Sequence, residues 1–200
     1  LIAGSMGDLG CFSFFPSKNM AVGGEGGMLT TTVSELTDAV SLVVNHGRSP
    51  SLESMQLGSN LRMSEVSAAI GTVQLKHLDN WVARRRAIAQ QYNDAFADLT
   101  LVATPKTRPG AKHAWHQYCL TTKYPDQLVN HLDSHGIDAR RYYSTPCHKQ
   151  AVFADHPQHD ETLPITDKLS NSLVAIPVMH ELTDIEVQRI IEAVVTFSVN

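Results

Sequence analysis

The sequence predicts a mixed α/β fold, and three observations carry this prediction. Residues 11–15 and 28–32 are short apolar or β-branched runs bounded by glycines, which is typical of strands. Residues 64–99 then repeat apolar side chains at helical spacing, over a length that exceeds an average helix several-fold. After a break rich in proline and threonine at residues 104–110, strand-like and helix-like segments alternate. We therefore expect a part built on two strands, followed by a long helical stretch and a smaller α+β unit.

One helix and one loop are predicted between the second strand and the long helical stretch. Apolar residues recur at helical spacing from about Ser34 to Asn45, and Gly47 is a natural stop. Residues 48–60 are polar and contain a proline, a glycine and several serines, which predicts an extended loop. A loop of this length is unusual in a compact domain, so we expect it to have a function.

The long helical stretch is expected to begin at Ser64, whose hydroxyl suits an N-cap. Its length leads us to expect a bend near Asn80 or a connector between two domains. The first half has an apolar stripe formed by Val66, Ala69, Ile70, Val73 and Leu78. The second half continues with Ala83, Ala87, Ile88, Tyr92, Ala95 and Phe96 on one side.

The remaining residues predict the α+β unit. Strand-like residues surround 115–122, a helix starts near Pro125 and stops at Gly136, and a second strand is expected near residues 137–143. The last helix should begin at a capping box that starts at Thr183, because Glu186 stands three residues later and apolar residues follow at helical spacing.

Composition and charge narrow the classes of partner. The net charge of -4 argues against a nucleic-acid surface, which is normally basic. The run Arg84-Arg85-Arg86 is the local exception, and we interpret it as a solvated helix face with ion pairs in preference to a phosphate site. No apolar stretch has the length of a membrane span, so no membrane partner is expected.

Cysteine and histidine usage predicts neither a disulfide framework nor a metal site. The three cysteines are odd in number, far apart and without a CxxC pair, which suits a reducing cytoplasm. The pairs His113/His116 and His156/His159 have no neighbouring cluster with ligand spacing, so we expect surface or pocket residues. The chain starts at Leu1 without a methionine, and we expect it to be a piece of a longer protein.

Lys18 is the strongest candidate for chemistry. It follows a short aromatic strand and precedes the glycine-rich turn at residues 23–27. Apolar walls disfavour the charged form of a lysine, and an imine-forming lysine must be a free amine. Ser13 stands five residues earlier and offers a hydroxyl to an anion, while the glycines let backbone N–H groups approach a ligand closely. Taken alone, a lysine beside glycines is more often a solvated loop residue.

Lys18 is one part of a series of blocks that resembles a known family. The blocks are Phe-Ser-Phe-x-x-x-Lys at 12–18, Gly-Glu-Gly-Gly at 24–27, Gly-x-Asn-x-Arg-Met at 58–63, Gln74-Leu75, Arg84-Arg85, Tyr-x-x-Pro-x-His at 143–148 and a Leu-x-x-Pro-like strand before the last helix. In this order and spacing they are similar to the DegT/StrS-type family of PLP-dependent nucleotide-sugar aminotransferases. The resemblance implies PLP-dependent transferase fold type I. Residues 1–85 would be the C-terminal part of the large PLP-binding domain, and 86–200 the small α+β C-terminal domain.

The resemblance also implies roles for individual residues. Lys18 would bind pyridoxal 5'-phosphate covalently and act as the catalytic residue, and Ser13 would donate a hydrogen bond to the cofactor phosphate. Asn60 matches a residue that reaches across a homodimer interface to the partner's phosphate. Alone, Asn60 is more often a turn residue that leads into a helix.

Three further residues match positions that line the substrate pocket. Arg62 lies near substrate in the family, and its planar guanidinium suits a carboxylate or a diphosphate. Tyr143 and His148 match a segment beside the sugar nucleotide. Taken alone, Arg62 is a first-turn surface charge. Tyr142 departs from the histidine often found at its position, and its role stays open.

The implied activity is transfer of an amino group from an amino acid to a keto group of a nucleotide-linked sugar. L-glutamate is the expected amino donor, and the cytoplasm is the expected location. Family members extend considerably further on the N-terminal side, where the remaining cofactor-binding residues lie, so we expect the 200-residue piece alone to be inactive. Two alternatives are a PLP-dependent sugar dehydratase, in which a residue other than lysine stands at position 18, and a catalytically silent homologue that serves as a regulator or partner subunit.

Overall fold

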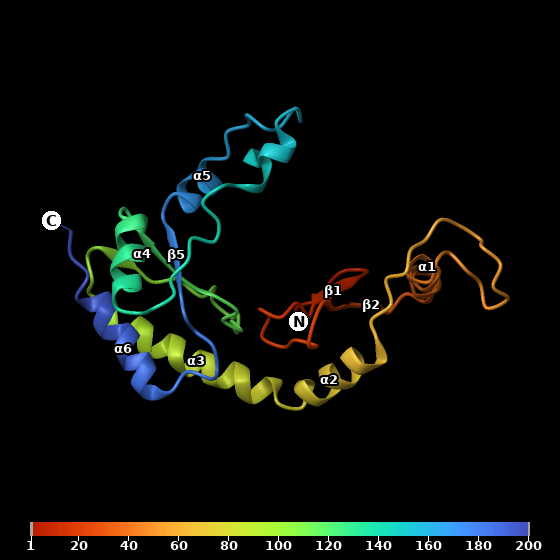
Figure 1. Ribbon diagram of the computed structural model, residues 1–200, viewed down its shortest axis with the longest axis horizontal. Coiled ribbons are helices and arrows are strands. Elements are labelled where there is room, and N and C mark those ends of the chain that lie inside the picture. Colours follow the sequence, from red (N-terminus) through yellow and green to blue (C-terminus); the bar gives the residue numbers. More distant parts are fainter. Residues whose placement is uncertain (1, 200) are drawn as a thin grey trace. The chain divides into compact units, whose positions relative to one another are not determined.

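The computed structural model describes residues 2–199, which form two compact units divided between Asp79 and Asn80. Helices and strands occur together in each unit, so the prediction of a mixed α/β fold is confirmed (Figure 1). Each unit has its own packing and is described by itself. The functional boundary expected between residues 85 and 86 stays a prediction.

The first unit begins with an antiparallel strand pair, β1 (Gly10–Ser13) and β2 (Gly27–Thr30). Both predicted strands are confirmed, each slightly earlier in the chain than expected. Directly past the ladder, the backbone N–H of Phe14 donates to the carbonyl of Gly26 at 2.8 Å. This hydrogen bond closes the base of the loop between the strands, and that loop carries Lys18.

Helix α1 (Ser34–Val44) follows β2, and the predicted polar loop after it folds back onto the end of the helix. The backbone N–H of His46 donates to Ser59 at 3.0 Å, and that of Leu61 donates to Val44 at 3.0 Å. Gly47 has a φ of 70°, and a Cβ there would stand 1.8 Å from the carbonyl oxygen of Gln56. Only glycine fits at this close approach, so the residue that stops the helix also lets the loop return.

Helix α2 (Glu65–Leu75) starts where the sequence predicted, because the Ser64 hydroxyl accepts a hydrogen bond from the backbone N–H of Ser67 at 3.1 Å. The helix packs against the loop between β1 and β2. Gly71 is buried in this contact, and a Cβ there would lie 3.0 Å from the Val22 side chain. Small size at position 71 therefore lets α2 approach the segment that follows Lys18.

Much of the predicted apolar stripe of α2 is nevertheless exposed. Val66 is 72% exposed and Val73 is 56% exposed, and Leu57 in the preceding loop is 97% exposed. Buried apolar residues in this unit are confined to Met20 and Val22 among those described. The first unit thus presents apolar side chains that its own packing does not cover.

The helical stretch predicted over residues 64–99 is two helices. The chain leaves α2 at Lys76 and His77, whose backbone N–H groups donate three residues back, and it resumes as α3 (Leu78–Ala95). Hydrogen bonds of this kind tighten the last turn of a helix. We expected a bend or a connector near Asn80. The helical stretch is interrupted as expected, but a few residues earlier, at Lys76 and His77.

The second unit is built on an antiparallel sheet with the order β3-β4-β5. Its strands are β3 (Val102–Ala103), β4 (Tyr118–Thr122) and β5 (Leu173–Ile176). Burial alternates along β4, where Tyr118, Leu120 and Thr122 are buried and the residues between them are partly exposed. This period of two indicates a sheet that turns one face toward a core.

Helices α3, α4 (Pro125–Ser134) and α6 (Asp184–Val195) supply the rest of that core (Figure 1). The helix predicted from Pro125 to Gly136 is confirmed as α4, and Gly136 takes a φ of 71° just after it. The core side chains from these helices include Ile88, Tyr92, Leu128, Leu132, Val187, Ile190 and Val194, and Phe96 joins them directly after α3.

The strand expected near residues 137–143 is wrong. Only one isolated bridge forms there, between Arg140 and Ala175 of β5. Ile137 and Ala139 are buried while Asp138 between them is exposed, so burial alternates as in a strand. Beyond Arg140 the chain leaves β5, and the ladder does not continue. Burial thus alternates along this segment although only a single bridge, and no ladder, forms there.

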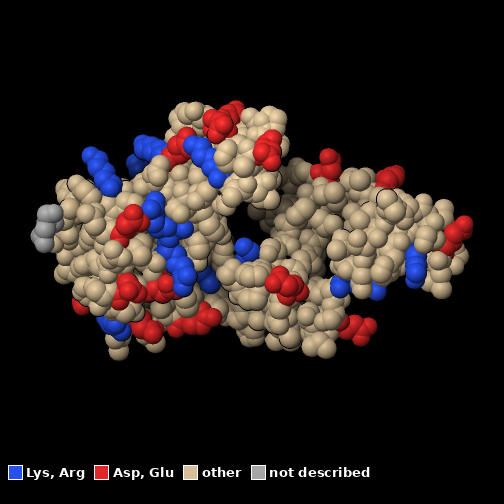
Figure 2. All heavy atoms as spheres, turned by 45° about the horizontal axis from the view of Figure 1, so that its top comes forward, with Lys and Arg blue, Asp and Glu red and all other residues tan. Residues whose placement is uncertain are grey.

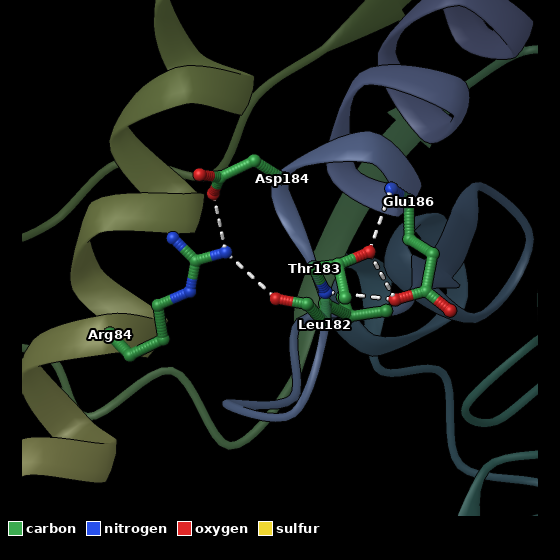
Figure 3. Close-up of polar contacts among 5 residues, drawn as sticks. All are labelled: Arg84, Leu182, Thr183, Asp184 and Glu186. Carbon is green, nitrogen blue, oxygen red and sulfur yellow. Dashed lines mark hydrogen bonds and ion pairs between the residues drawn. The ribbon is translucent and has the colours of Figure 1, made fainter.

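The last helix begins at the predicted capping box, which Figure 3 shows. The backbone N–H of Glu186 donates to the Thr183 hydroxyl at 3.3 Å, and the Glu186 carboxylate accepts from the Thr183 backbone N–H at 2.8 Å. The hydrogen bonds that the Glu186 carboxylate accepts from the backbone N–H and the hydroxyl of Thr183 hold the pKa of Glu186 below its ordinary value. Arg84 of α3 donates to the Leu182 carbonyl and pairs with Asp184, both at 2.7 Å, so α3 and the start of α6 are joined.

Candidate functional site

Lys18 lies in the loop between β1 and β2 and is half-buried. Its backbone N–H donates to the carbonyl of Phe15 at 2.9 Å, which makes a tight turn over residues 15–18. Ser13 ends β1, and its hydroxyl oxygen accepts from the backbone N–H of Phe15 at 3.4 Å. Ser13 and Lys18 are therefore both hydrogen-bonded to the backbone of Phe15. The proton of the Ser13 hydroxyl stays available to a ligand.

The glycine-rich turn after Lys18 is shaped by close packing. Gly23 has a φ of 76°, which only glycine adopts readily. A Cβ on Gly26 would stand 2.5 Å from the Val22 side chain and 3.2 Å from Met63 Sδ. A side chain at Gly26 would thus collide with its surroundings, whereas nothing lies within 4 Å of a Cβ on Gly24. Gly26 is therefore packed between Val22 and Met63, and the Ser13 hydroxyl, which accepts from Phe15, keeps a proton that suits a phosphate oxygen.

Asn60 and Arg62 meet at the end of α1. The backbone of Asn60 bridges to Asn45, and Arg62 Nη1 donates to the side-chain oxygen of Asn45. The Asn60 side chain is exposed and makes no hydrogen bond to any residue within 2–199. No hydrogen bond or ion pair between described residues joins Asn60 or Arg62 to Lys18. Met63 connects this segment to the glycine-rich turn instead, because its sulfur lies beside Gly26.

Tyr143 and His148 belong to the second unit, on a segment that leaves the sheet after Arg140. Tyr143 is 70% exposed. His148 lies in a short 3-10 turn, η1 (Cys147–Lys149), and its carbonyl accepts from a ring nitrogen of His159 at 3.1 Å. His148 Nε2 is buried and has no hydrogen-bond partner among the described residues. A ligand that reaches this nitrogen would satisfy it.

This segment is held to the rest of its unit by a charge pair. Lys149 donates to Asp167 of α5 (Pro164–Ser170) at 2.8 Å, and a second turn, η2 (Ala151–Phe153), follows. The hydrogen bond from Lys149 keeps the pKa of Asp167 below its ordinary value. Lys149, the residue after His148, thus fixes the turn that carries His148 to α5.

Two residues that position the candidate site received no role from the sequence. Gln74 of α2 accepts a hydrogen bond from the backbone N–H of Ala21, three residues after Lys18, and Met63 packs at Gly26. A polar residue within the apolar stripe of α2 was the available signal for Gln74. The available signal for Met63 was its place in the block at residues 58–63 that resembles the family.

The described part of the chain contains no group of three His, Cys, Asp or Glu side chains that could hold a metal ion. None of the helices in residues 2–199 is both long and apolar enough to span a membrane.

The run Arg84-Arg85-Arg86 was expected to be a solvated helix face with ion pairs. This is correct for Arg84, which forms an ion pair, and wrong for Arg85, which is buried. Burial lowers the pKa of Arg85, and its Nη1 donates to the carbonyls of Trp115 at 3.2 Å and Val178 at 3.1 Å.

The architecture matches a solved structure closely. DesV from S. venezuelae, crystallised in complex with a ketimine intermediate, superposes with a TM-score of 0.90 at 31% identity, over 94% of this chain and 51% of that one. The fold is therefore that of the PLP-dependent transferases of fold type I, as the sequence predicted.

The family follows from the sequence match. Residues 2–195 match the DegT/DnrJ/EryC1/StrS aminotransferase family, and the chain belongs to it. A pleiotropic regulatory protein from Geobacillus stearothermophilus is 34% identical over 97% of this chain and 53% of its own length. A UDP-N-acetyl-3-dehydro-alpha-D-glucosamine 3-aminotransferase from Acidithiobacillus ferrooxidans is 34% identical over 94% and 50%. The chain thus spans about half the length of the curated relatives it matches.

Proposed function

We propose that the protein containing this chain transfers an amino group from an amino acid to a keto group of a nucleotide-linked sugar. L-glutamate is the proposed amino donor. The single observation that carries the proposal is the presentation of Lys18. Its turn is continuous with Ser13 and is followed by the glycine-rich turn at residues 23–27, which packs against α2. The aminotransferase from A. ferrooxidans, whose name specifies a keto sugar linked to UDP, supports the substrate class.

The cofactor of this proposal is pyridoxal 5'-phosphate. When bound, it supplies an aldehyde that accepts the amino group and a ring that withdraws electrons from the reacting carbon. Lys18 would hold it covalently and, once released, move a proton at the donor α-carbon. Ser13 would donate its hydroxyl to the phosphate. The positive φ of Gly23 and the close packing at Gly26 hold the turn that follows Lys18.

The remaining predicted residues would recognise substrate or complete the partner's site. Asn60, whose side chain is exposed, would reach the phosphate held by a second copy of the chain. Arg62, Tyr143 and His148 would contact the sugar nucleotide. A guanidinium suits a diphosphate or carboxylate, and the buried Nε2 of His148 suits a hydroxyl or phosphoryl oxygen.

A homodimer is part of the proposal. The apolar side chains exposed on α2 and at Leu57 suit burial against further protein. In this proposal residues 1–85 belong to the large PLP-binding domain and residues 86–200 form the small domain. We place the enzyme in the cytoplasm, and we expect the 200-residue chain alone not to turn over.

Covalent trapping tests the proposal. The full-length protein is incubated with pyridoxal 5'-phosphate, reduced with borohydride and digested, and the labelled peptide is identified by mass spectrometry. The label is expected on Lys18, and Lys18→Arg should abolish it while Lys76→Arg, at an exposed lysine in the same unit, should not. A label on another lysine, or none, contradicts the assignment.

Turnover assays decide between the proposal and its alternatives. Glutamate should bleach the visible absorbance of the holoenzyme, and a nucleotide keto-sugar should restore it. A silent regulatory homologue is favoured by one relative, the pleiotropic regulatory protein from G. stearothermophilus. That alternative predicts no spectral response to any amino acid. A dehydratase is disfavoured by the lysine at position 18.

A further inference from the structure

A pocket of about 420 Å³ lies in the second unit, between α3 and the segment that precedes β4. Its volume falls in the range of small-molecule sites, roughly 300–1,000 Å³. The lining residues are Arg86, Gln90, Asn93, Thr107, Ala111, Lys112, His113 and Trp115. Two of them are cations, and no carboxylate is among them.

Most polar groups of this pocket are donors without a protein acceptor. The terminal amino groups of Arg86 and the ammonium of Lys112 make no hydrogen bond to any described residue, and neither does the hydroxyl of Thr107. Asn93 uses its side-chain oxygen to accept from the Tyr118 hydroxyl at 2.7 Å, which leaves its NH₂ group to donate. A ligand here must therefore supply acceptors.

His113 adds a further donor with a defined orientation. Its Nδ1 accepts from the backbone N–H of Trp115 at 2.8 Å, so the neutral ring carries its proton on Nε2. The ring lies 4.2 Å from that of Trp115, centroid to centroid, which fixes its plane. Gln90 already donates its amide to Asp94 at 2.8 Å, and its remaining oxygen is the acceptor on this wall.

The walls are held in place by α3. Arg86 Nε donates to the carbonyl of His113 at 2.8 Å, and the neighbouring Arg85 donates to the carbonyl of Trp115 at 3.2 Å. Two adjacent arginines thus fasten the segment 113–115 to the helix. Trp115 takes a φ of 48°, and its backbone N–H donates to the ring of His113. Binding would require little rearrangement, which favours affinity.

We propose that this pocket binds a small phosphate-bearing molecule. Convergent N–H donors of a guanidinium, an ammonium, an amide and an imidazole match the several acceptor oxygens of a phosphate or diphosphate group. Figure 2 shows the charged side chains on one face of the molecule, with lysine and arginine in blue. The inference does not depend on the proposed function of Lys18.

Titration calorimetry on the purified full-length protein tests the proposal, with inorganic pyrophosphate, inorganic phosphate and glucose 1-phosphate as separate probes at constant ionic strength. We expect saturable binding of at least one probe and protection of residues 107–115 from hydrogen exchange. Lys112→Gln and Arg86→Gln should each weaken binding about tenfold. Lys106→Gln is the matched control, because it removes the same charge from an exposed lysine that does not line the pocket.

Two results would overturn the proposal. One is no saturable binding of any probe at concentrations up to about 1 mM. The other is an equal loss in Lys106→Gln and Lys112→Gln, which would reduce the effect to net charge. Lys112 has no hydrogen bond to lose within the described chain, so its variant keeps the test valid even if Arg86→Gln does not fold.

Discussion

Gln74 Oε1 accepts a hydrogen bond of 2.9 Å from the backbone N–H of Ala21, a residue 53 positions earlier. The bond joins the second half of α2 to the segment that follows Lys18. Val22, next in the chain, is buried against Gly71 one turn earlier on the same helix. A hydrogen bond and a close packing contact therefore fix adjacent residues of the loop to adjacent turns of α2.

Replacing Gln74 should loosen this loop. Gln74→Leu keeps the size of the side chain but leaves the Ala21 N–H without its acceptor, which should cost about 1–3 kcal/mol. Gln74→Glu retains an acceptor and should restore most of the loss. Hydrogen exchange of residues 19–24 is the measurement, and it should accelerate only in Gln74→Leu. Gln91→Leu, at an exposed position of α3, is the control; equal acceleration there would contradict the assignment.

Gly26 and Gly24 offer a matched pair. Gly26→Ala would bring a Cβ to 2.5 Å from the Val22 side chain and 3.2 Å from Met63 Sδ, so the loop must shift. Overpacking of this kind costs about 1–3 kcal/mol. Gly24→Ala meets nothing within 4 Å and should leave stability nearly unchanged. Urea unfolding of both variants checks this, and borohydride labelling at Lys18 should weaken only in Gly26→Ala. Equal behaviour of the two alanine variants would show that the packing at Gly26 does not position Lys18.

Short-range sequence patterns correctly predicted the features that depend only on residues close together in the chain. Ser64 and Thr183 cap their helices as predicted, since a cap depends on residues within one turn. The position of Lys18 beside Ser13 also follows from adjacent residues. The segment at 137–143 failed for the opposite reason. Its alternation reflects burial of Ile137 and Ala139 against a core made by distant elements, and strand pairing needs a neighbour that the pattern cannot supply.

Arg85 shows that a local sequence pattern also cannot predict which side chains of a candidate site are buried. Three consecutive arginines on a helix predict one solvated face, yet successive residues on a helix point about 100° apart. Arg84 therefore reaches Asp184, while Arg85 turns into the core and Arg86 turns toward the pocket. Which of the three is buried depends on how α3 packs on the sheet, and no local pattern contains that information. Gln74 was left without a role for a similar reason, because its partner is remote in the chain.

Arg85 should matter more to stability than its neighbour Arg84. Arg85→Met removes the donor to the carbonyls of Trp115 and Val178 in a buried site, and we expect a loss of about 1–3 kcal/mol. Arg84→Met removes a pair with the exposed Asp184, and such surface pairs contribute about 0–1 kcal/mol. Urea unfolding compares the two. A larger loss in Arg84→Met would mean that the buried guanidinium is not stabilising.

His180 should make the second unit less stable in acid. Its ring stacks on Trp81 at 4.4 Å between centroids, and burial there lowers the pKa of His180 from its ordinary value of 6.5. Glu181 opposes this shift and Arg85 adds to it. Because the folded state resists protonation, the stabilising effect is complete above the unfolded pKa of about 6.5 and is lost as the pH falls through the lower, folded pKa.

Unfolding free energies measured from pH 7.5 down to pH 5 should therefore fall more steeply in the wild-type protein than in His180→Gln, which has no group to titrate at this position. His156→Gln is the control, because His156 is exposed, and its slope should match the wild type. The pH slope separates titration from lost packing, since a loss of the Trp81 contact alone would lower stability equally at every pH. Parallel curves for wild type and His180→Gln would show that protonation of His180 does not contribute.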